Sequence, residues 1–266
     1  MISLGMLRDV WRFRDFMWGA VKREFQARWT GTQLGAFWVV AQPLATILIF
    51  TLIFSRLINP SLPGHSSRFA YSIYLCSGVL TWNLFAEMLG RSVGIFVENA
   101  NLLKKIRFPK LCLPIIVLTS SILNFAVILS LFLLFLVLVS AFPGVVVLAA
   151  LPVLLIQAGF AIGLGILLAT VNVFYRDVQQ IVQIVLQFWF WLTPIVYVAR
   201  QLPGTVRDLM SWNPMWRLIQ AYQDIFLGHR LPEWSTLGYP ALLALFFLGL
   251  GMFAYHRLQG EIVDEL

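Results

Sequence analysis

Charged residues interrupt this chain only at intervals, and the stretches between them are long enough to cross a membrane. From 111 to 175 no Asp, Glu, Lys or Arg occurs for 65 residues. One helix of that length would measure about 100 Å, against about 30 Å for the hydrocarbon core of a bilayer. The chain must therefore turn back, and Phe142-Pro143-Gly144 is the segment that predicts the turn.

The same pattern predicts an all-α integral membrane protein, with a single transmembrane domain over residues 1–266. Six transmembrane helices are expected, at about residues 33–56, 69–92, 111–140, 145–173, 178–199 and 235–257. An even number of spans leaves both termini on one side of the membrane. Gly159 and Gly163 form a small-residue pair in the fourth span, a pattern compatible with close helix packing.

The N-terminal segment, residues 4–28, has the pattern of an amphipathic helix. Its apolar side chains recur at helical spacing and are Leu4, Leu7, Trp11, Trp18, Val21 and Phe25. The polar side chains on the opposite face are Arg8, Arg12, Asp15, Lys22 and Gln26. This pattern predicts an interfacial helix that lies along the membrane surface with its cations at the lipid phosphates. A soluble surface helix is the alternative.

Residues 200–233, between the last two predicted spans, are too polar to cross the membrane and too apolar to extend freely into water. Asn213-Pro214 has the form of a helix N-cap with proline at the first helical position. Apolar residues then keep helical spacing up to Gly228, which is a typical residue after a helix end. These signals predict a short helix on the outer face. Residues 202–211 are a candidate for a segment that dips back into the membrane.

Composition and charge fit a membrane protein with a defined orientation. The chain is 60% hydrophobic and 12% charged, whereas a soluble domain carries about 25% charged residues. The net charge of +7 favours anionic lipid rather than nucleic acid as its partner, because the cations flank the apolar spans. With six spans, 13 cations fall on the side of the termini and 6 on the other. The positive-inside rule then places both termini in the cytoplasm.

Signatures of enzymes and metal sites are missing from the sequence. It has no GxxxxGK[ST] phosphate loop, no HExxH, no GxSxG and no paired-cysteine motif. The two cysteines and three histidines have no partners at metal-binding spacing. Glu87 and Arg91, one helical turn apart, are expected to pair with each other. We therefore expect no catalytic residue, no metal site and no cofactor in this chain.

The predicted spans contain many aromatic side chains and neutral amides. The amides are Gln42, Asn124, Gln157, Asn172, Gln183 and Gln187. A buried amide costs several kcal/mol unless it is hydrogen-bonded, so each needs a partner on another helix or on a substrate. Amides beside aromatic rings suit a substrate with many hydroxyls and apolar C–H faces, as sugars have. Polar contacts that hold helices together would look much the same.

Several motifs resemble those of the permease subunits of polysaccharide-export ATP-binding-cassette transporters. They are Leu34-Gly35-Ala36-Phe37-Trp38 with Pro43, the segments 71–78, 172–178 and 190–197, and Trp212-Asn213-Pro214-Met215. The likeness runs from about residue 20 to the end. It is closest to lipopolysaccharide O-antigen exporters; teichoic-acid exporters are similar and capsule exporters less so. A drug- or lipid-exporting permease of the same superfamily is a further alternative, and a membrane enzyme acting on lipid-linked sugars is another.

The resemblance implies a homodimer that works with two copies of a separate ATPase in the bacterial inner membrane. The dimer would form a channel for a polysaccharide linked to undecaprenyl diphosphate. ATP and Mg²⁺ would bind to the ATPase, in agreement with the missing phosphate loop. In such permeases the loop after the second span couples to the ATPase, and here it falls at 98–110. Helices between the fifth and sixth spans form a periplasmic gate, here within 200–233.

The residues that these roles would assign form three sets. The coupling residues are Glu98, Asn99, Asn101, Leu102, Leu103, Lys104, Lys105, Arg176 and Asp177. The gate residues are Pro203, Asn213, Pro214 and Tyr222. The polysaccharide path contains Trp38, Gln42, Tyr71, Tyr74, Trp82, Phe85, Gln183, Gln187 and Trp191. The alternative for the path residues on the second and fifth spans is that they form packing surfaces between helices.

Overall fold

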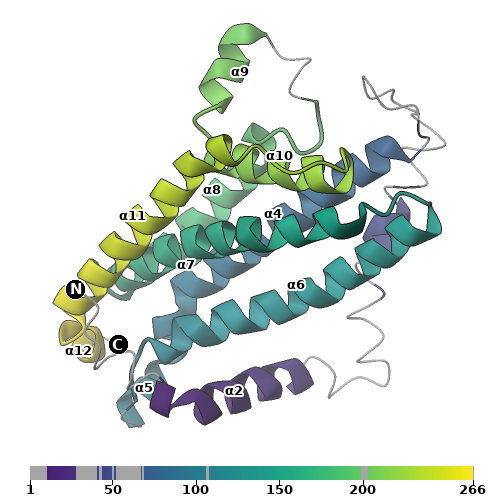
Figure 1. Cartoon of the computed structure of the whole chain (residues 1–266). Coiled ribbons are helices and arrows are strands. Elements are labelled where there is room, and N and C mark those ends of the chain that lie inside the picture. The colour runs from purple at the N-terminus through teal and green to yellow at the C-terminus, as the bar shows by residue number, and fades with distance from the viewer. Residues whose placement is uncertain are drawn as a thin grey trace.

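The computed structural model describes residues 11–27, 41, 44–49, 51, 67, 69–105, 108–198 and 203–265, and of residues 263 and 264 it describes the backbone only. Long helices lie side by side: α4 (Ala70–Glu98), α6 (Cys112–Leu138), α7 (Ala150–Phe174), α8 (Val178–Leu192) and α11 (Trp234–Leu258) (Figure 1). At one end of this bundle, here called the α5 end, lie α5 (Ala100–Lys105) and α12 (Glu261–Glu265). At the other, the α10 end, lie α9 (Gly204–Met210) and α10 (Pro214–Phe226).

The helix α7 packs against α4 on one side and α11 on the other. Glycines permit both contacts. A Cβ atom added to Gly163 would lie 2.5 Å from the backbone nitrogen of Leu248 on α11, and one added to Gly165 would lie 2.5 Å from Cβ of Ser92 on α4. The Gly159–Gly163 pair is compatible with close helix packing, and such packing is present. At Gly163 the backbone of α7 lies directly against the backbone of α11.

The turn predicted at Phe142-Pro143-Gly144 is confirmed. The helix α6 ends at Leu138, and the chain re-enters helix as the 3₁₀ segment η2 (Gly144–Ala149), which runs into α7. Gly144 has a φ of +64°, a conformation that costs glycine nothing and most other residues a steric penalty. The local sequence thus supplies both the helix breaker and the residue that the turn requires.

Three of the described helices are long and apolar enough to cross a membrane: α6, the continuous η2–α7 stretch Gly144–Phe174, and α11. The helix α4 has 29 residues and continues to Glu98, beyond the end predicted at 92. The span predicted at 33–56 lies mostly outside the described residues, so the six-span arrangement stays a prediction.

The helix α8 is shorter than the span predicted at 178–199. It has 15 residues and ends at Leu192, so it measures about 22 Å, less than the hydrocarbon core. Pro194 explains the early end, because proline cannot donate a helix hydrogen bond and disfavours the helical conformation of the residue before it. Residues 193–198 continue without helix. The predicted boundary at 199 was wrong.

The helix α2 (Arg14–Ala27) lies alongside α6 (Figure 1). The Phe16 ring is 5.3 Å from that of Phe108, and Val21 is buried in a hydrophobic cluster with side chains from α4, α5, α6, α7, α11 and α12. Trp11 and Trp18 are 68% and 59% exposed. The predicted apolar stripe is thus divided: Val21 packs on protein, whereas the tryptophans remain open to the surroundings. Leu4 and Leu7 lie outside the described residues.

Candidate functional site

Glutamines of α8 lie over small residues of α4, one turn after another. The side-chain nitrogen of Gln183 would be 2.9 Å from a Cβ atom on Gly90, and that of Gln179 would be 2.9 Å from one on Gly94. The pairing is antiparallel and repeats every four residues on both helices. The glycines therefore leave room on α4 for long polar side chains of α8.

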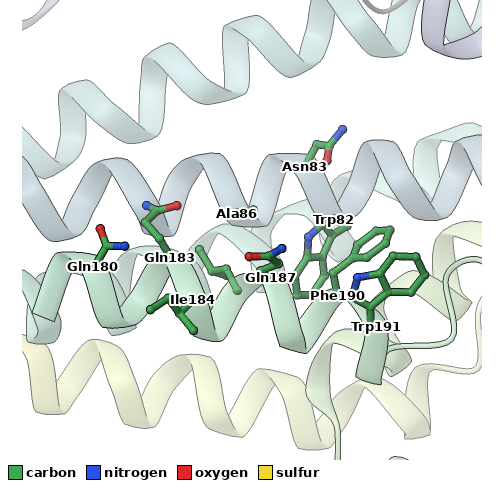
Figure 2. A pocket seen from close by; sticks show the side chains of 10 residues that line it. Trp82, Asn83, Ala86, Gln180, Gln183, Ile184, Gln187, Phe190 and Trp191 are labelled. Carbon is green, nitrogen blue, oxygen red and sulfur yellow. The ribbon is translucent and has the colours of Figure 1, made fainter.

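A cavity of 480 Å³ opens along this contact. Its lining is Trp82, Asn83 and Ala86 from α4 and Gln180, Gln183, Ile184, Leu186, Gln187, Phe190 and Trp191 from α8. Figure 2 shows Gln180 and Gln183 towards one end, Trp82, Phe190 and Trp191 towards the other, and Gln187 between them. None of these lining residues is charged. The cavity thus presents amide groups followed by indole and phenyl rings.

The amides predicted to need partners fall into two groups. Asn172, Gln157 and Asn124 bond across helices: Asn172 Nδ2 donates to the Val93 carbonyl at 3.2 Å, Gln157 Nε2 to the Thr81 carbonyl at 2.8 Å, and Asn124 Nδ2 to Glu87 at 3.0 Å. Gln183 and Gln187 are exposed in the cavity, with no hydrogen bond to any residue that the structure describes. The first group holds helices together, and the second is available to a ligand.

The aromatic residues predicted for the path also separate. Trp82 and Trp191 line the cavity, and the Trp82 ring packs 5.8 Å from that of Phe190. Phe85 is fully buried and stacks on Phe160 at 5.5 Å, so it does not line this cavity, and its place on the polysaccharide path stays a prediction. Trp38 and Gln42 lie outside the described residues.

Tyrosines of α4 hold the segment that follows α8, at the α10 end. The Tyr71 hydroxyl donates to the Val196 carbonyl, and the Tyr74 hydroxyl lies 3.2 Å from the Pro194 carbonyl and 3.0 Å from the Tyr197 carbonyl. Tyr74 is 8% exposed. These tyrosines therefore position the segment that follows α8, and neither lines the cavity; their place on the polysaccharide path stays a prediction.

Asn213 joins the end of α8 to the start of α10. Its Oδ1 accepts the Met215 backbone N–H at 3.0 Å, which confirms the predicted N-cap, and also the Trp189 indole N–H at 3.0 Å. Its Nδ2 donates to the Thr193 hydroxyl at 2.9 Å. One side chain thus fixes two helices that do not follow one another in the chain.

The other predicted gate residues occupy different environments. Pro214 is the first residue of α10 and is buried, and Tyr222 is fully buried, whereas Pro203 is exposed where α9 begins. In the last turn of α10, Asp224 Oδ1 lies 2.6 Å from Nη2 of Arg230, which follows the helix. This bond raises the pKa of the Arg230 guanidinium. Tyr222 and Pro214 therefore anchor α10 to the bundle, while α9 presents its surface outward.

The predicted coupling residues gather at the α5 end. A short helix, α5, occupies the predicted loop, with Leu103 buried, Leu102 half-buried, and Asn101, Lys104 and Lys105 exposed. Asn99 follows α4, and its Nδ2 donates to the Ile95 carbonyl at 2.9 Å. Arg176 and Asp177 are exposed in the turn between α7 and α8. Glu98 accepts a bond from Gln179 at 3.3 Å, so the end of α4 contacts the start of α8.

The predicted path lacks several residues that line the cavity, among them Asn83, Ala86 and Phe190. Asn83 is a neutral amide inside the predicted second span, and this residue type was the signal that could have found it. Within the described residues no group of three or more His, Cys, Asp and Glu could hold a metal ion. The uncharged amides and aromatic rings of the cavity suit binding of a neutral, hydrogen-bonding molecule.

Comparison with known proteins gives one matching family and several relatives. The model of the family described as ABC-2 type transporter matches residues 16–227. The chain is 29% identical to the O-antigen export system permease protein RfbA of Myxococcus xanthus, over 98% of this chain and 99% of the relative. It is 26% identical to a protein of the same name in Klebsiella pneumoniae, over the full length of both. The polysialic acid transport protein KpsM of Escherichia coli is 21% identical over 91% of this chain and 93% of the relative.

Proposed function

Because this chain belongs to the ABC-2 type transporter family, we propose that it forms the channel of an ATP-driven exporter for undecaprenyl-diphosphate-linked polysaccharide of the O-antigen type. The chain is a membrane subunit of this transporter class, and ATP is hydrolysed by a separate partner subunit. Its full-length similarity to two O-antigen export permeases supports this choice of polymer.

The chemistry of the cavity between α4 and α8 is the observation that carries the proposal. Gln183 and Gln187 offer donors and acceptors to sugar hydroxyls, and the exposed Trp191 offers a ring face to sugar C–H groups, while the buried Trp82 backs the cavity. The lining residues are uncharged. A moving polymer must leave each contact as readily as it forms it, and neutral groups meet this requirement because charge-assisted hydrogen bonds are about twice as strong.

A homodimer with two copies of the ATP-binding partner would complete the channel. The α8 side chains that line the cavity are largely exposed in the single subunit, so a second copy could close over them. The six-span arrangement with both termini in the cytoplasm belongs to this proposal. The α5 end then faces the cytoplasm of a bacterial cell, and the partner binds ATP and Mg²⁺.

The two ends of the bundle would have different tasks. On the cytoplasmic side, α5 and the Arg176–Asp177 turn contact the ATP-binding partner, with Leu103 anchoring α5 in the subunit. On the periplasmic side, the segment 200–233, which contains α9 and α10, gates the exit of the polymer. Asn213 links that gate to the end of α8 through Trp189 and Thr193.

A substitution in the cavity tests the proposal. In a strain that lacks the gene, we expect Gln187→Leu to restore less long-chain surface polysaccharide than the wild-type gene. The control is Gln259→Leu, an exposed glutamine just after α11 that lies neither in the cavity nor in the segment 200–233, and it should restore export fully. Membrane content and the ATPase activity of the purified complex should match in both variants. Equal export by both variants would show that the cavity is not part of the route of the polysaccharide.

A capsule-type polymer is the second candidate, because the chain is also similar to a polysialic acid transport protein. The deletion strain separates the two: loss of lipopolysaccharide O-chains supports the first candidate, and loss of capsule supports the second. A strain that keeps both polymers and only becomes drug-sensitive would contradict both.

A further inference from the structure

A charged cluster joins α2, α4 and α6 in the half of the bundle nearer the α5 end. Arg91 Nη2 of α4 lies 2.7 Å from Glu24 Oε1 of α2. Arg91 Nη1 lies 3.4 Å from Glu87 Oε1, one turn earlier on the same helix, so the predicted Glu87–Arg91 pair is confirmed and a second carboxylate joins it. The side chains are 29% (Arg91), 29% (Glu24) and 26% (Glu87) exposed. Charges within a membrane bundle are rare and often mark function.

The helix α6 bonds each of these carboxylates separately. The Ser120 hydroxyl donates to Glu24 Oε2 at 2.8 Å, and Asn124 Nδ2 donates to Glu87 Oε2 at 3.0 Å. Each carboxylate thus has its own bond to α6, and the Arg91 guanidinium is bonded to both carboxylates. The Ser121 hydroxyl of α6 also accepts from Arg91 Nη1 and donates to Glu87 Oε1, each at 3.4 Å. The cluster is therefore two carboxylate sites on either side of one cation.

Arg91 would keep a partner if α2 moved away. Its guanidinium would lose Glu24 but retain Glu87, which is fixed on the same helix. Breaking a buried ion pair is costly mainly because it leaves a charge without compensation. Glu87 removes that penalty for Arg91, and Ser120 would be left as a neutral hydroxyl. The arrangement therefore suits a contact that opens and closes, which a single isolated pair would not.

The helix α2 also packs against the part of the subunit that would respond to ATP. Val21 lies in one hydrophobic cluster with Leu103 of α5, and Phe16 contacts Phe108 just after α5. Side-chain packing therefore connects α5 to α2. Glu24, further along α2, is the point where this helix is bonded to both α4 and α6.

We propose that Arg91 is a positioning residue with one constant and one releasable carboxylate partner. It holds α2 against α4 and α6 through Glu24, and it keeps only Glu87 and Ser121 when ATP binding by the partner subunit displaces α2. This inference rests on the proposed function, because the displacement begins where the partner contacts α5. None of the three charged residues lines the cavity between α4 and α8.

Distances between two spin labels test the inference in the full complex with its ATP-binding partner. Cysteines replace Lys22 on α2 and Ser130 on α6, both exposed, after the buried Cys76 and Cys112 are replaced by alanine. The mean distance should shift between the nucleotide-free complex and the complex trapped with ATP and vanadate. Glu24→Gln should give the displaced distance without nucleotide. Glu87→Gln should reduce the shift, because it removes the second partner.

An unchanged distance in a complex that hydrolyses ATP would overturn the inference, and so would a shift that Glu87→Gln leaves intact. If Glu24→Gln fails to assemble, Glu87→Gln still decides, since it leaves the Glu24–Arg91 pair in place. Arg91→Lys keeps the charge and should retain part of the shift. The proposed function is judged separately. Polysaccharide export without a change in distance overturns only the proposed role of Arg91. A change in distance without polysaccharide export overturns only the proposed substrate.

Discussion

Replacing Asn213 by alanine tests whether one side chain fixes the end of α8 to the start of α10. The change removes an N-cap, worth about 1 kcal/mol. It also leaves the Trp189 indole N–H without its acceptor, which costs about 1–3 kcal/mol when the donor is buried. Trp189 is only partly buried, so the lower part of that range applies. We expect a total loss of about 2–3 kcal/mol in the free energy of unfolding.

Two further variants separate the contributions. Asn213→Ser keeps an N-cap oxygen but is too short to reach both Trp189 and Thr193. It should therefore lose only the part of the stability that comes from the bonds to α8. Asn213→Asp keeps both bonds accepted by Oδ1 and replaces the donor to Thr193, and its charge is favourable at a helix N-terminus. It should therefore be the mildest of the three changes.

The assay is unfolding of the purified subunit in detergent, combined with proteolysis of the segment 203–213. Of the three variants, Asn213→Ala should lower the unfolding midpoint most, and it should make cleavage of the segment 203–213 faster. Trp189→Phe, which removes the indole donor, should be much less harmful in the Asn213→Ala background than alone, because the two residues share one bond. Additive losses from Trp189→Phe and Asn213→Ala, or equal midpoints for Ala and wild type, would show that Asn213 does not connect the helices.

Three other outcomes follow from the structure. Gly163→Val should abolish the folded subunit because its Cβ would lie 2.5 Å from the Leu248 backbone nitrogen, whereas Gly159→Ala, with its nearest contact at 3.5 Å, should keep normal membrane levels. A photo-reactive residue at Asn101, exposed on α5, should cross-link to the ATP-binding partner; its absence from every cross-linked product would contradict the coupling role. A cysteine at Arg23, exposed on α2, should be labelled from the cytoplasm, and labelling from the periplasm would reverse the proposed orientation.

Features that depend on a few neighbouring residues could be predicted from the sequence. The turn at Phe142-Pro143-Gly144 and the Asn213 cap both follow from local backbone chemistry, and both are present in the structure. The early end of α8 had the same kind of signal in Thr193-Pro194. Apolar composition favoured a longer helix there, but the missing N–H of proline overrides composition.

Features that depend on how deeply a side chain is buried, or on contacts between residues far apart in the sequence, could not be predicted. Phe85 and Trp82 lie on the same stripe of α4, yet one is enclosed by Phe160 and the other lines the cavity. Helical spacing says which residues share a face and nothing about what covers it. The predicted span at 33–56 lies between Glu24 and Arg91 in the sequence, and no local pattern links a carboxylate in an amphipathic segment to one arginine in a span.

The register of α4 against α8 also limits how this sequence can evolve. At Gly94, any larger residue would meet Gln179 and Glu98 at once, and at Gly90 it would meet Gln183. The atoms in the way are the ends of flexible side chains, so a larger residue at either glycine would displace the facing glutamine from its place over α4, whereas shortening the glutamine first would leave a gap. Positions 90 and 183, and positions 94 and 179, should consequently change as pairs among descendants of this gene.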